Sequence, residues 1–335
     1  MNLATFTSPR NSAPRLGAVL DEGATPHMID LALGYAWLLR TTEQDPHADL
    51  VAQARIPAQM IDFLKGGEHS MVAARSTVAL LREVGAGAAT RQALLDQGVL
   101  VPMDAVRLLA PIPRPGKIIS VGANYQAHVQ EARDASVLRD IPDYPVAFIK
   151  MSSSVIGHDG AVIKSRHTEE LDYEVELTIV IGKACKDVGV EDWQDCVAGY
   201  TIVNDISMRD LILQEQPSGI VFQGKSLDTT CPMGPYLVTS DEITDPGKLR
   251  IGLRVNGVQR QDDTTASMRY DCATIVSYWS RLGLEPGDVI TTGTPAGVAG
   301  FRKRFPQLLL NPGDVIEAEI EGLGILRNSV VADLA

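Results

Sequence analysis

The sequence predicts an α+β protein in which a smaller N-terminal α/β domain, residues 1–110, precedes a β-rich C-terminal domain, residues 117–335. Two observations support this division. Residues 28–98 place apolar side chains at helical spacing, whereas the chain beyond residue 117 consists of short apolar runs broken by turn sequences. Between them, residues 111–116 contain three prolines, which disfavour both a helix and a central strand and therefore mark a domain boundary.

The N-terminal domain is expected to combine a small β unit with a helical cap. Residues 3–6 and 16–20 are apolar and are separated by a turn-rich stretch, which is typical of two short strands. From Met28 to about Gly98 the pattern becomes helical, and residues 72–84 are rich in Ala, Leu and Arg.

The C-terminal domain is expected to be built mainly from strands. Its apolar runs are short, and Pro-Gly, Asn-Gly and Gly-Thr-Pro sequences separate them, as turns separate strands. The runs are residues 117–121, 171–181, 200–203, 236–238, 249–255, 289–292 and 315–320.

The charge of the chain limits its partners. The formal net charge is -12, so a nucleic acid or an anionic membrane surface would on average be repelled. No run approaches the roughly 20 apolar residues of a membrane span, and Met1 to Pro14 does not resemble a signal peptide. The four cysteines lack the spacing of a zinc site, and free thiols in a cytoplasmic protein are the expectation.

A predicted strand with two glutamates is the first candidate for a functional site. Residues 172–181 read as a strand, and residues two apart lie on one strand face, so Glu174 and Glu176 point the same way. A Glu-x-Glu strand is more often a solvated face. A second strand-like run, however, ends in Asp205, and three converging carboxylates would repel one another unless a cation sits among them. Oxygen ligands select a hard ion, and Mg²⁺ is the expectation.

From Lys117 to the C-terminus the chain resembles the fumarylacetoacetate hydrolase family. The resemblance rests on motifs that follow one another in the family order: Lys117 to His128, Ile149-Lys-Met-Ser-Ser-Ser154, Leu171 to Leu177, Gly199 to Asp205, Arg209-Asp210, Gly224-Lys-Ser226, Val255-Asn-Gly257 and Thr292-Gly-Thr-Pro295. It implies a C-terminal domain built as a mixed β-roll or β-sandwich, a homodimer formed through that domain, and Mg²⁺ or Mn²⁺ on Glu174, Glu176 and Asp205.

The resemblance also implies a catalytic group. Asn124 is the expected N-cap of the helix that carries His128 and Glu131. Because the two residues are three apart, they share a helix face. In the family the matching pair activates water, on a segment that closes over the site, which here corresponds to residues 131–145. The role implied for Lys225 is to stabilise an oxyanion. A histidine near a turn or a loop lysine is, taken alone, more often structural.

Four further residues are expected to contact the substrate: Tyr125, Arg209, Gln214 and Thr294. Many members place a glutamine three or four residues after the position of Arg209, whereas this chain has Ile212 there and a glutamine only at Gln214. Whether Gln214 compensates decides how polar the pocket is.

These expectations converge on hydrolysis of a carbon–carbon bond in a small 1,3-dicarbonyl acid, such as an acylpyruvate, fumarylpyruvate or fumarylacetoacetate. The same metal site would also serve a decarboxylase, an isomerase or a hydratase of a related 2-oxo acid. A non-catalytic metal-binding protein is the remaining alternative, but such a protein would be free to lose His128, Glu131 and Lys225.

Overall fold

The chain divides into two units, Met1–Ile112 and Pro113–Ala335, and the boundary between them falls within the proline-rich segment of the sequence. The computed structural model describes residues 1–20, 26–85, 87–135, 141–301 and 306–334. Within these ranges no helix is long and apolar enough to cross a membrane.

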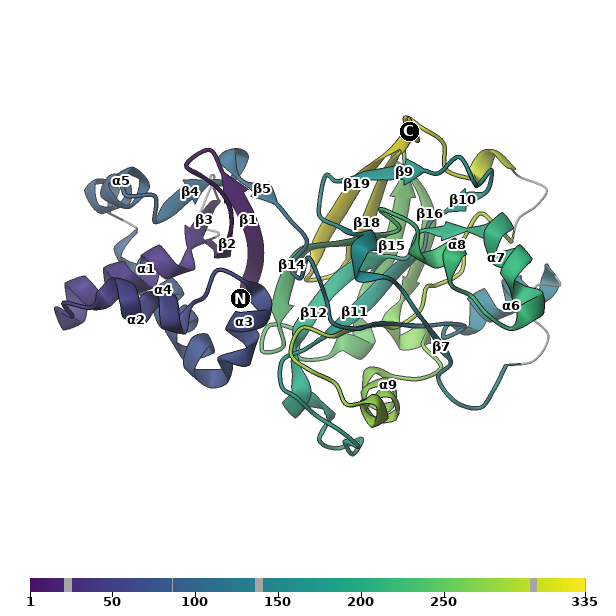
Figure 1. The fold of residues 1–335 in the computed structure, drawn as a ribbon, viewed down its shortest axis with the longest axis horizontal. Coiled ribbons are helices and arrows are strands. Elements are labelled where there is room, and N and C mark those ends of the chain that lie inside the picture. The colour runs from purple at the N-terminus through teal and green to yellow at the C-terminus, as the bar shows by residue number, and fades with distance from the viewer. Residues whose placement is uncertain (21–25, 86, 136–140, 302–305, 335) are drawn as a thin grey trace. The chain divides into compact units, whose positions relative to one another are not determined.

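The first unit is an antiparallel sheet with helices packed around it (Figure 1). Its strand order is β4-β3-β2-β1, with β5 paired to β1. The elements are β1 (Asn2–Ser8), β2 (Asn11–Leu20), β3 (His27–Asp30), α1 (Leu31–Leu38), α2 (Ala48–Arg55), α3 (Met60–Lys65), α4 (Gly67–Val84), α5 (Ala88–Asp96), β4 (Leu100–Pro102) and β5 (Arg107–Leu108).

The predicted helical start at Met28 is wrong by three residues. His27–Asp30 forms a strand because it pairs with β2 on one side and with β4 on the other. The first helix begins at Leu31, where the Asp30 carboxylate accepts the Leu33 N–H at 3.1 Å and so caps the helix.

The second unit contains a mixed sheet in the order β14-β12-β11-β17-β6-β7, with β8 added to β14. Only the pairs β17–β6 and β14–β8 are parallel. The bounds are β6 (Ile118–Val121), β7 (Ala147–Ile149), β8 (Val155–Ile156), β11 (Val175–Ile181), β12 (Val197–Asn204), β14 (Cys231–Thr239) and β17 (Val289–Thr291).

A second sheet, β16-β15-β18-β19-β9, packs against the first. Its strands are β9 (Ala161–Lys164), β15 (Arg250–Val255), β16 (Val258–Thr264), β18 (Val315–Ile320) and β19 (Gly324–Ala332). The largest apolar core lies between the sheets and joins Leu177 of β11, Leu253 of β15 and Ala318 of β18, which are all fully buried. The predicted α+β class with a β-sandwich as its second part is confirmed.

Helices of the second unit lie at the edges of this sandwich and carry several of the predicted site residues (Figure 1). They are α6 (Gln126–Asp134), α7 (Arg209–Glu215), α8 (Gln223–Ser226) and α9 (Cys272–Trp279). The expected N-cap of α6 is wrong: Tyr125 occupies that position, and the Asn124 amide instead donates to the carbonyls of Tyr270 and Thr292. Asn124 therefore joins three segments of the second unit.

The predicted strand 171–181 is divided in two. Leu171–Asp172 forms β10, which pairs with β13 (Ser207–Met208), and β11 begins only at Val175. At the break, both backbone N–H groups donate to side chains instead of a neighbouring strand: Tyr173 N–H to Asp172 Oδ1 at 2.8 Å and Glu174 N–H to Asn204 Oδ1 at 2.9 Å.

Candidate active site

Three buried carboxylates meet at one end of the β11–β12 pair. Glu174 precedes β11, Glu176 is its second residue, and Asp205 follows β12 directly. The antiparallel register places Val175 opposite Asn204, so the start of one strand lies beside the end of the other. One oxygen of each carboxylate lies within 4.8 Å of the other two. The structure therefore brings together the three acids that the sequence singled out.

Three buried cations surround this triad. The Lys225 ammonium donates to Glu174 Oε2 and Asp205 Oδ2, both at 2.7 Å, and the Arg209 guanidinium donates to Glu174 Oε1. Lys150, whose side chain is fully buried, donates to Asp205 Oδ1 at 2.6 Å and to the Lys225 carbonyl. Each oxygen of Glu174 and Asp205 thus contacts a cation.

A fourth carboxylate, Asp172, fixes the orientation of Arg209. Arg209 Nε donates to Asp172 Oδ2 at 2.8 Å, and the same carboxylate binds the backbone of Ala299 and Gly300. Asp172 is fully buried. It therefore connects the start of α7 to the loop that leads to Phe301.

The charges divide unevenly over the two glutamates. Burial would raise the pKa of Glu174, but Lys225, Arg209 and His128 outweigh it and hold this pKa below its ordinary value. Glu176 forms no ion pair with a lysine or arginine among the described residues, and its Oε2 accepts the Gly293 N–H at 2.9 Å. Burial, together with Asp205 and Glu174, raises the pKa of Glu176 well above its ordinary value.

This imbalance fits a divalent metal ion. The triad offers carboxylate oxygens, the donors that Mg²⁺ and Mn²⁺ prefer. A cation among Glu174, Glu176 and Asp205 would supply the positive charge that Glu176 lacks, whereas Glu174 and Asp205 already have theirs from lysine and arginine. The residues present therefore fit the predicted metal, and the three acids are the groups that would hold it.

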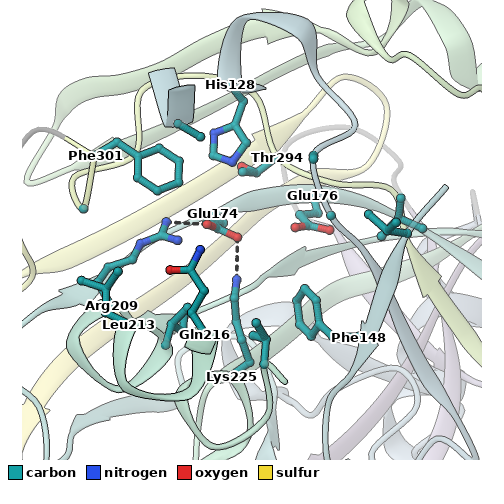
Figure 2. Close-up of a pocket in the computed structure, with 18 residues that line it drawn as sticks. His128, Phe148, Glu174, Glu176, Arg209, Leu213, Gln216, Lys225, Thr294 and Phe301 are labelled. Atoms are coloured by element: carbon teal, nitrogen blue, oxygen red, sulfur yellow. Dashed lines mark hydrogen bonds and ion pairs between the residues drawn. The ribbon is translucent and has the colours of Figure 1, made fainter. Parts of the chain in front are cut away.

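A cavity of about 250 Å³ opens over the triad. Figure 2 shows His128 and Phe301 on one side of Glu174, and Arg209, Gln216 and Lys225 on the other. The lining residues are Val121, Gly122, Ala123, His128, Ala132, Val146, Phe148, Glu174, Glu176, Arg209, Ile212, Leu213, Gln216, Val221, Lys225, Thr294, Gly300 and Phe301. Apolar side chains thus make up most of the wall around a charged floor.

His128 faces this cavity from α6. Burial lowers its pKa below the ordinary value of 6.5, and Arg209 and Lys225 act in the same direction against the opposing effect of Glu174. The imidazole is therefore neutral near pH 7. Its ring packs against Phe301 with centroids 5.2 Å apart, and within the described part of the chain its Nδ1 has no hydrogen-bond partner.

Glu131 lies on the same helix, one turn further, but its carboxylate accepts the Gly297 N–H at 2.9 Å. The two side chains are close enough for Glu131 to raise the pKa of His128. The hydrogen bond that would make them a water-activating pair is not formed to His128 Nδ1. Part of the predicted lid, residues 136–140, lies outside the described residues.

The four predicted substrate contacts are placed differently from one another. Arg209 and Thr294 line the cavity, although the Thr294 hydroxyl is already engaged, donating to the Val175 carbonyl at 2.9 Å. Tyr125 is fully buried and does not line the cavity. Gln214 is exposed and also lies outside the lining, because the helical phase of α7 turns it outwards.

Sequence reasoning missed several residues of the site. Gln216, rather than Gln214, supplies the amide in the cavity wall. Lys150 and Asp172 stand in motifs that carry the family resemblance, but nothing in their spacing indicates that they bind Asp205 and Arg209. A lysine and an aspartate inside otherwise apolar runs were the available signal, since charged residues are rarely buried unless they are paired.

The fold and the site define an α+β protein whose β-sandwich carries a buried carboxylate triad beneath a small cavity. The sequence model described as fumarylacetoacetate (FAA) hydrolase C-terminal matches residues 117–331. The chain belongs to the fumarylacetoacetate hydrolase family.

Known relatives extend the likeness to nearly the whole chain. "Oxaloacetate tautomerase Fahd2a, mitochondrial" of Rattus norvegicus is 36% identical over 332 residues, which cover 99% of this chain and 92% of the relative. Among solved structures, the fumarylacetoacetate hydrolase of Exiguobacterium antarcticum is 32% identical with a TM-score of 0.70, covering 99% of this chain and 100% of its own. The 5-carboxymethyl-2-hydroxymuconate delta-isomerase of Mycobacterium smegmatis is 27% identical with a TM-score of 0.68 and the same coverage. These relatives are named as enzymes that isomerise or hydrolyse small organic acids.

Proposed function

We propose that the protein catalyses keto–enol tautomerisation of a small 2-oxo acid whose third carbon is acidified by a second carbonyl group. One observation carries this proposal: a neutral imidazole, His128, shares a cavity with Glu174 and Glu176 of the carboxylate triad, and its Nδ1 has no hydrogen-bond partner among the described residues. Tautomerisation needs a base and a polarised carbonyl but no attacking water. The name of the rat relative, an oxaloacetate tautomerase, agrees with this assignment.

The reaction moves one proton. A divalent ion bound by the triad would supply the positive charge that polarises the C2 carbonyl and makes the neighbouring C–H more acidic. The His128 imidazole takes the proton from C3, and the C–H electron pair becomes the C2=C3 double bond while the C2 oxygen gains the negative charge. The imidazolium then returns the proton to that oxygen, so atoms and charge balance.

Other residues of the site stabilise this charge shift. Lys225 lines the cavity floor; burial would lower its pKa, but Asp205 and Glu174 outweigh burial and raise it, so the ammonium persists next to the developing oxyanion. Phe301 and Phe148 cover the two sides of the site and limit the access of water. The shift of charge therefore takes place in surroundings of low polarity, where the cationic groups act most strongly.

Hydrolysis of an acylpyruvate-like carbon–carbon bond is the second candidate. It is favoured by the position of Glu131 one helical turn from His128 and by the likeness to a fumarylacetoacetate hydrolase. It would require a hydrogen bond from the imidazole to the Glu131 carboxylate, whereas in this structure Glu131 Oε2 accepts the Gly297 N–H and His128 Nδ1 has no partner among the described residues. We rank it second for that reason.

The test is a product analysis with Mg²⁺ present. Enol forms of oxaloacetate and of 2,4-dioxopentanoate are added, the decay of enol absorbance is followed, and chromatography identifies the acids that remain. We expect faster interconversion with no cleavage product. His128→Ala should slow it by roughly 10²–10⁴-fold, and Glu174→Gln should abolish it, while His158→Ala, outside the cavity, serves as the control. Formation of acetate and pyruvate from 2,4-dioxopentanoate at the rate of enol loss would establish the hydrolase instead.

A further inference from the structure

One carboxylate, that of Glu215, accepts three successive backbone N–H groups just before Lys225. The donors are Phe222 at 3.0 Å, Gln223 at 2.6 Å and Gly224 at 3.2 Å. Burial would raise the pKa of Glu215, but these donors outweigh burial and lower the pKa below its ordinary value of 4.5, so the carboxylate is ionised near neutral pH. Hydrogen bonds to an ionised acceptor are stronger than those between neutral groups. Glu215 therefore fixes the backbone of the turn that leads to Lys225.

The same carboxylate links the two segments that supply the cations of the site. Glu215 is the last residue of α7, and Arg209 is the first. Arg209 is held by Asp172 and Glu174 at the start of the helix. Lys225 also contacts Glu174, so both ends of this linked pair of segments meet at one glutamate of the triad.

The turn that carries Lys225 packs closely against α7 (Figure 1). A Cβ at Gly224 would lie 2.6 Å from Ile212 Cγ1 and 2.9 Å from the Ile212 nitrogen. Lys225 itself is only 4% exposed, and its carbonyl accepts the buried Lys150 ammonium. Because the lysine side chain is enclosed on all these sides, a shift of its backbone would displace its ammonium from the two carboxylates that it contacts.

We propose that Glu215 is a positioning residue of the active site, which acts through Lys225 by holding the turn that sets the place of its ammonium. The inference rests on the proposed function, in which Lys225 stabilises the oxyanion that forms on the substrate. Removal of the Glu215 carboxylate leaves three N–H groups to bind water, and the turn moves away from α7. A displacement of about 1 Å at a reacting group costs up to about 10²-fold in rate.

The first experiment is a double-mutant cycle with Mg²⁺ present, measured on the faster of the two enol substrates named above. We expect Glu215→Ala to lower kcat by roughly 10–10²-fold with little change in KM, because the oxyanion exists only in the transition state. Lys225→Met should lower kcat further. Adding Glu215→Ala to Lys225→Met should then cost less than about twofold. Losses that multiply in the double variant would show that the two residues act independently and would overturn the proposal.

Chemical modification of Lys225 gives a readout that is independent of turnover. The protein is treated with an amine-reactive N-hydroxysuccinimide ester, and mass spectrometry of its peptides follows acylation at the buried Lys225 and at the exposed Lys183. We expect Glu215→Ala to raise the rate at Lys225 by roughly tenfold, through local opening of the turn, and to leave the rate at Lys183 unchanged. Equal rates at Lys225 in the wild type and the variant would refute the role of Glu215.

The two readouts separate the inference from the proposed function. A wild-type protein without tautomerase activity would overturn the proposed function, whereas acylation would still report whether Glu215 holds the turn of Lys225. If Lys225→Met does not fold, acylation in Glu215→Ala decides alone. If Glu215→Ala does not fold, Glu215→Gln replaces it, because this variant keeps one acceptor oxygen but loses the charge, and the same changes are expected.

Asp271→Ala is the matched control. The Asp271 carboxylate accepts the Thr274 N–H at 2.8 Å at the start of α9 and does not line the cavity. This variant, like Glu215→Ala, removes a carboxylate that binds backbone N–H groups of the second unit. We expect it to leave kcat and the acylation of Lys225 unchanged. Effects as large as those of Glu215→Ala would attribute them to lower stability and would contradict the proposal.

Discussion

At the scale of single residues, Lys150 shows how strongly the site depends on a group that does not face the substrate. Its ammonium is fully buried and binds Asp205 Oδ1 and the Lys225 carbonyl. Removal of one partner from a buried ion pair leaves an uncompensated charge. Lys150→Met should therefore destabilise the second unit by about 3–5 kcal/mol, seen as a lower Tm.

The control for this prediction is Lys248→Met, which removes a lysine of an exposed ion pair and should leave the Tm unchanged. Mg²⁺ should raise the Tm of the Lys150 variant more than that of the wild type, because the ion supplies part of the missing charge. Equal melting temperatures of the two variants would show that Asp205 does not need this lysine.

His128 leads to a prediction about pH. Burial, Arg209 and Lys225 lower its pKa below 6.5, against the opposing effects of Glu174 and Glu131, and the proposed base is the neutral imidazole. At saturating Mg²⁺, kcat/KM should therefore stay level as the pH falls through 6.5 and should decline only at lower pH, as the imidazole gains its proton. Metal binding is measured over the same range as the control. An acid limb with its midpoint above 6.5 would show that His128 is not the base.

For individual residues, the sequence predicts the direction of a side chain on a strand but not its contacts with distant segments. The alternation of Glu174 and Glu176 is a period-two pattern, and its consequence follows from strand geometry alone. The partners Lys150 and Asp172 come from elsewhere in the chain, and their contacts depend on sheet order and loop paths. Asn124 failed as a cap because its Oδ1, the atom that would accept a helix N–H, instead accepts the N–H of Tyr270, distant in sequence, at 2.9 Å.

At the scale of elements, the loop 297–301 closes one side of the site. Glu131 binds its first residue and Asp172 binds Ala299 and Gly300, so the loop is held by two carboxylates. A Cβ at Gly300 would lie 2.6 Å from Arg209 Cδ and Nε. Gly300→Ala should therefore displace Arg209 from Glu174 and lower kcat/KM by roughly tenfold or more.

Gly87→Ala is the comparison for this variant. A Cβ at Gly87 meets its nearest atoms at 3.7 Å and 3.8 Å, which is ordinary contact, and its φ of -79° suits alanine. Wild-type activity in the Gly300 variant would mean that Arg209 can move without consequence. Its folding is checked by the Tm, so that loss of activity is not confused with loss of structure.

Element boundaries were harder to predict than element types. Most apolar runs beyond residue 117 are strands, since the short runs and turn sequences carry that signal locally. The break between β10 and β11 has no such signal, because there the N–H groups of Tyr173 and Glu174 bind the side chains of Asp172 and Asn204 instead of a strand backbone. The start of α1 was misplaced because β3 is defined by pairing with two distant strands.

At the scale of the whole molecule, the expected homodimer remains to be tested. Large apolar side chains of the second unit are exposed, with Ile149 62% and Ile220 57% accessible. Ile149 belongs to β7, the end strand of its sheet, and an exposed edge is a common site of association. We predict a mass of twice 36.1 kDa by light scattering.

Ile149→Lys places a charge on this edge and should shift the dimer towards the monomer on dilution. Lys183→Ala, on a different exposed loop, is the control. A mass of 36.1 kDa for the wild-type chain at micromolar concentration would contradict the dimer.

The charged floor and the apolar wall of the cavity come from different parts of the fold, and this affects how the substrate preference of such a protein can change during evolution. The triad lies at one end of the β11–β12 pair, whereas α7 and the residues before α8 supply Ile212, Leu213 and Val221. Exchange of these wall residues would change the shape and polarity of the cavity while leaving the three carboxylates in place. Mutations in this wall can therefore change substrate preference while the fold and the reacting groups are retained.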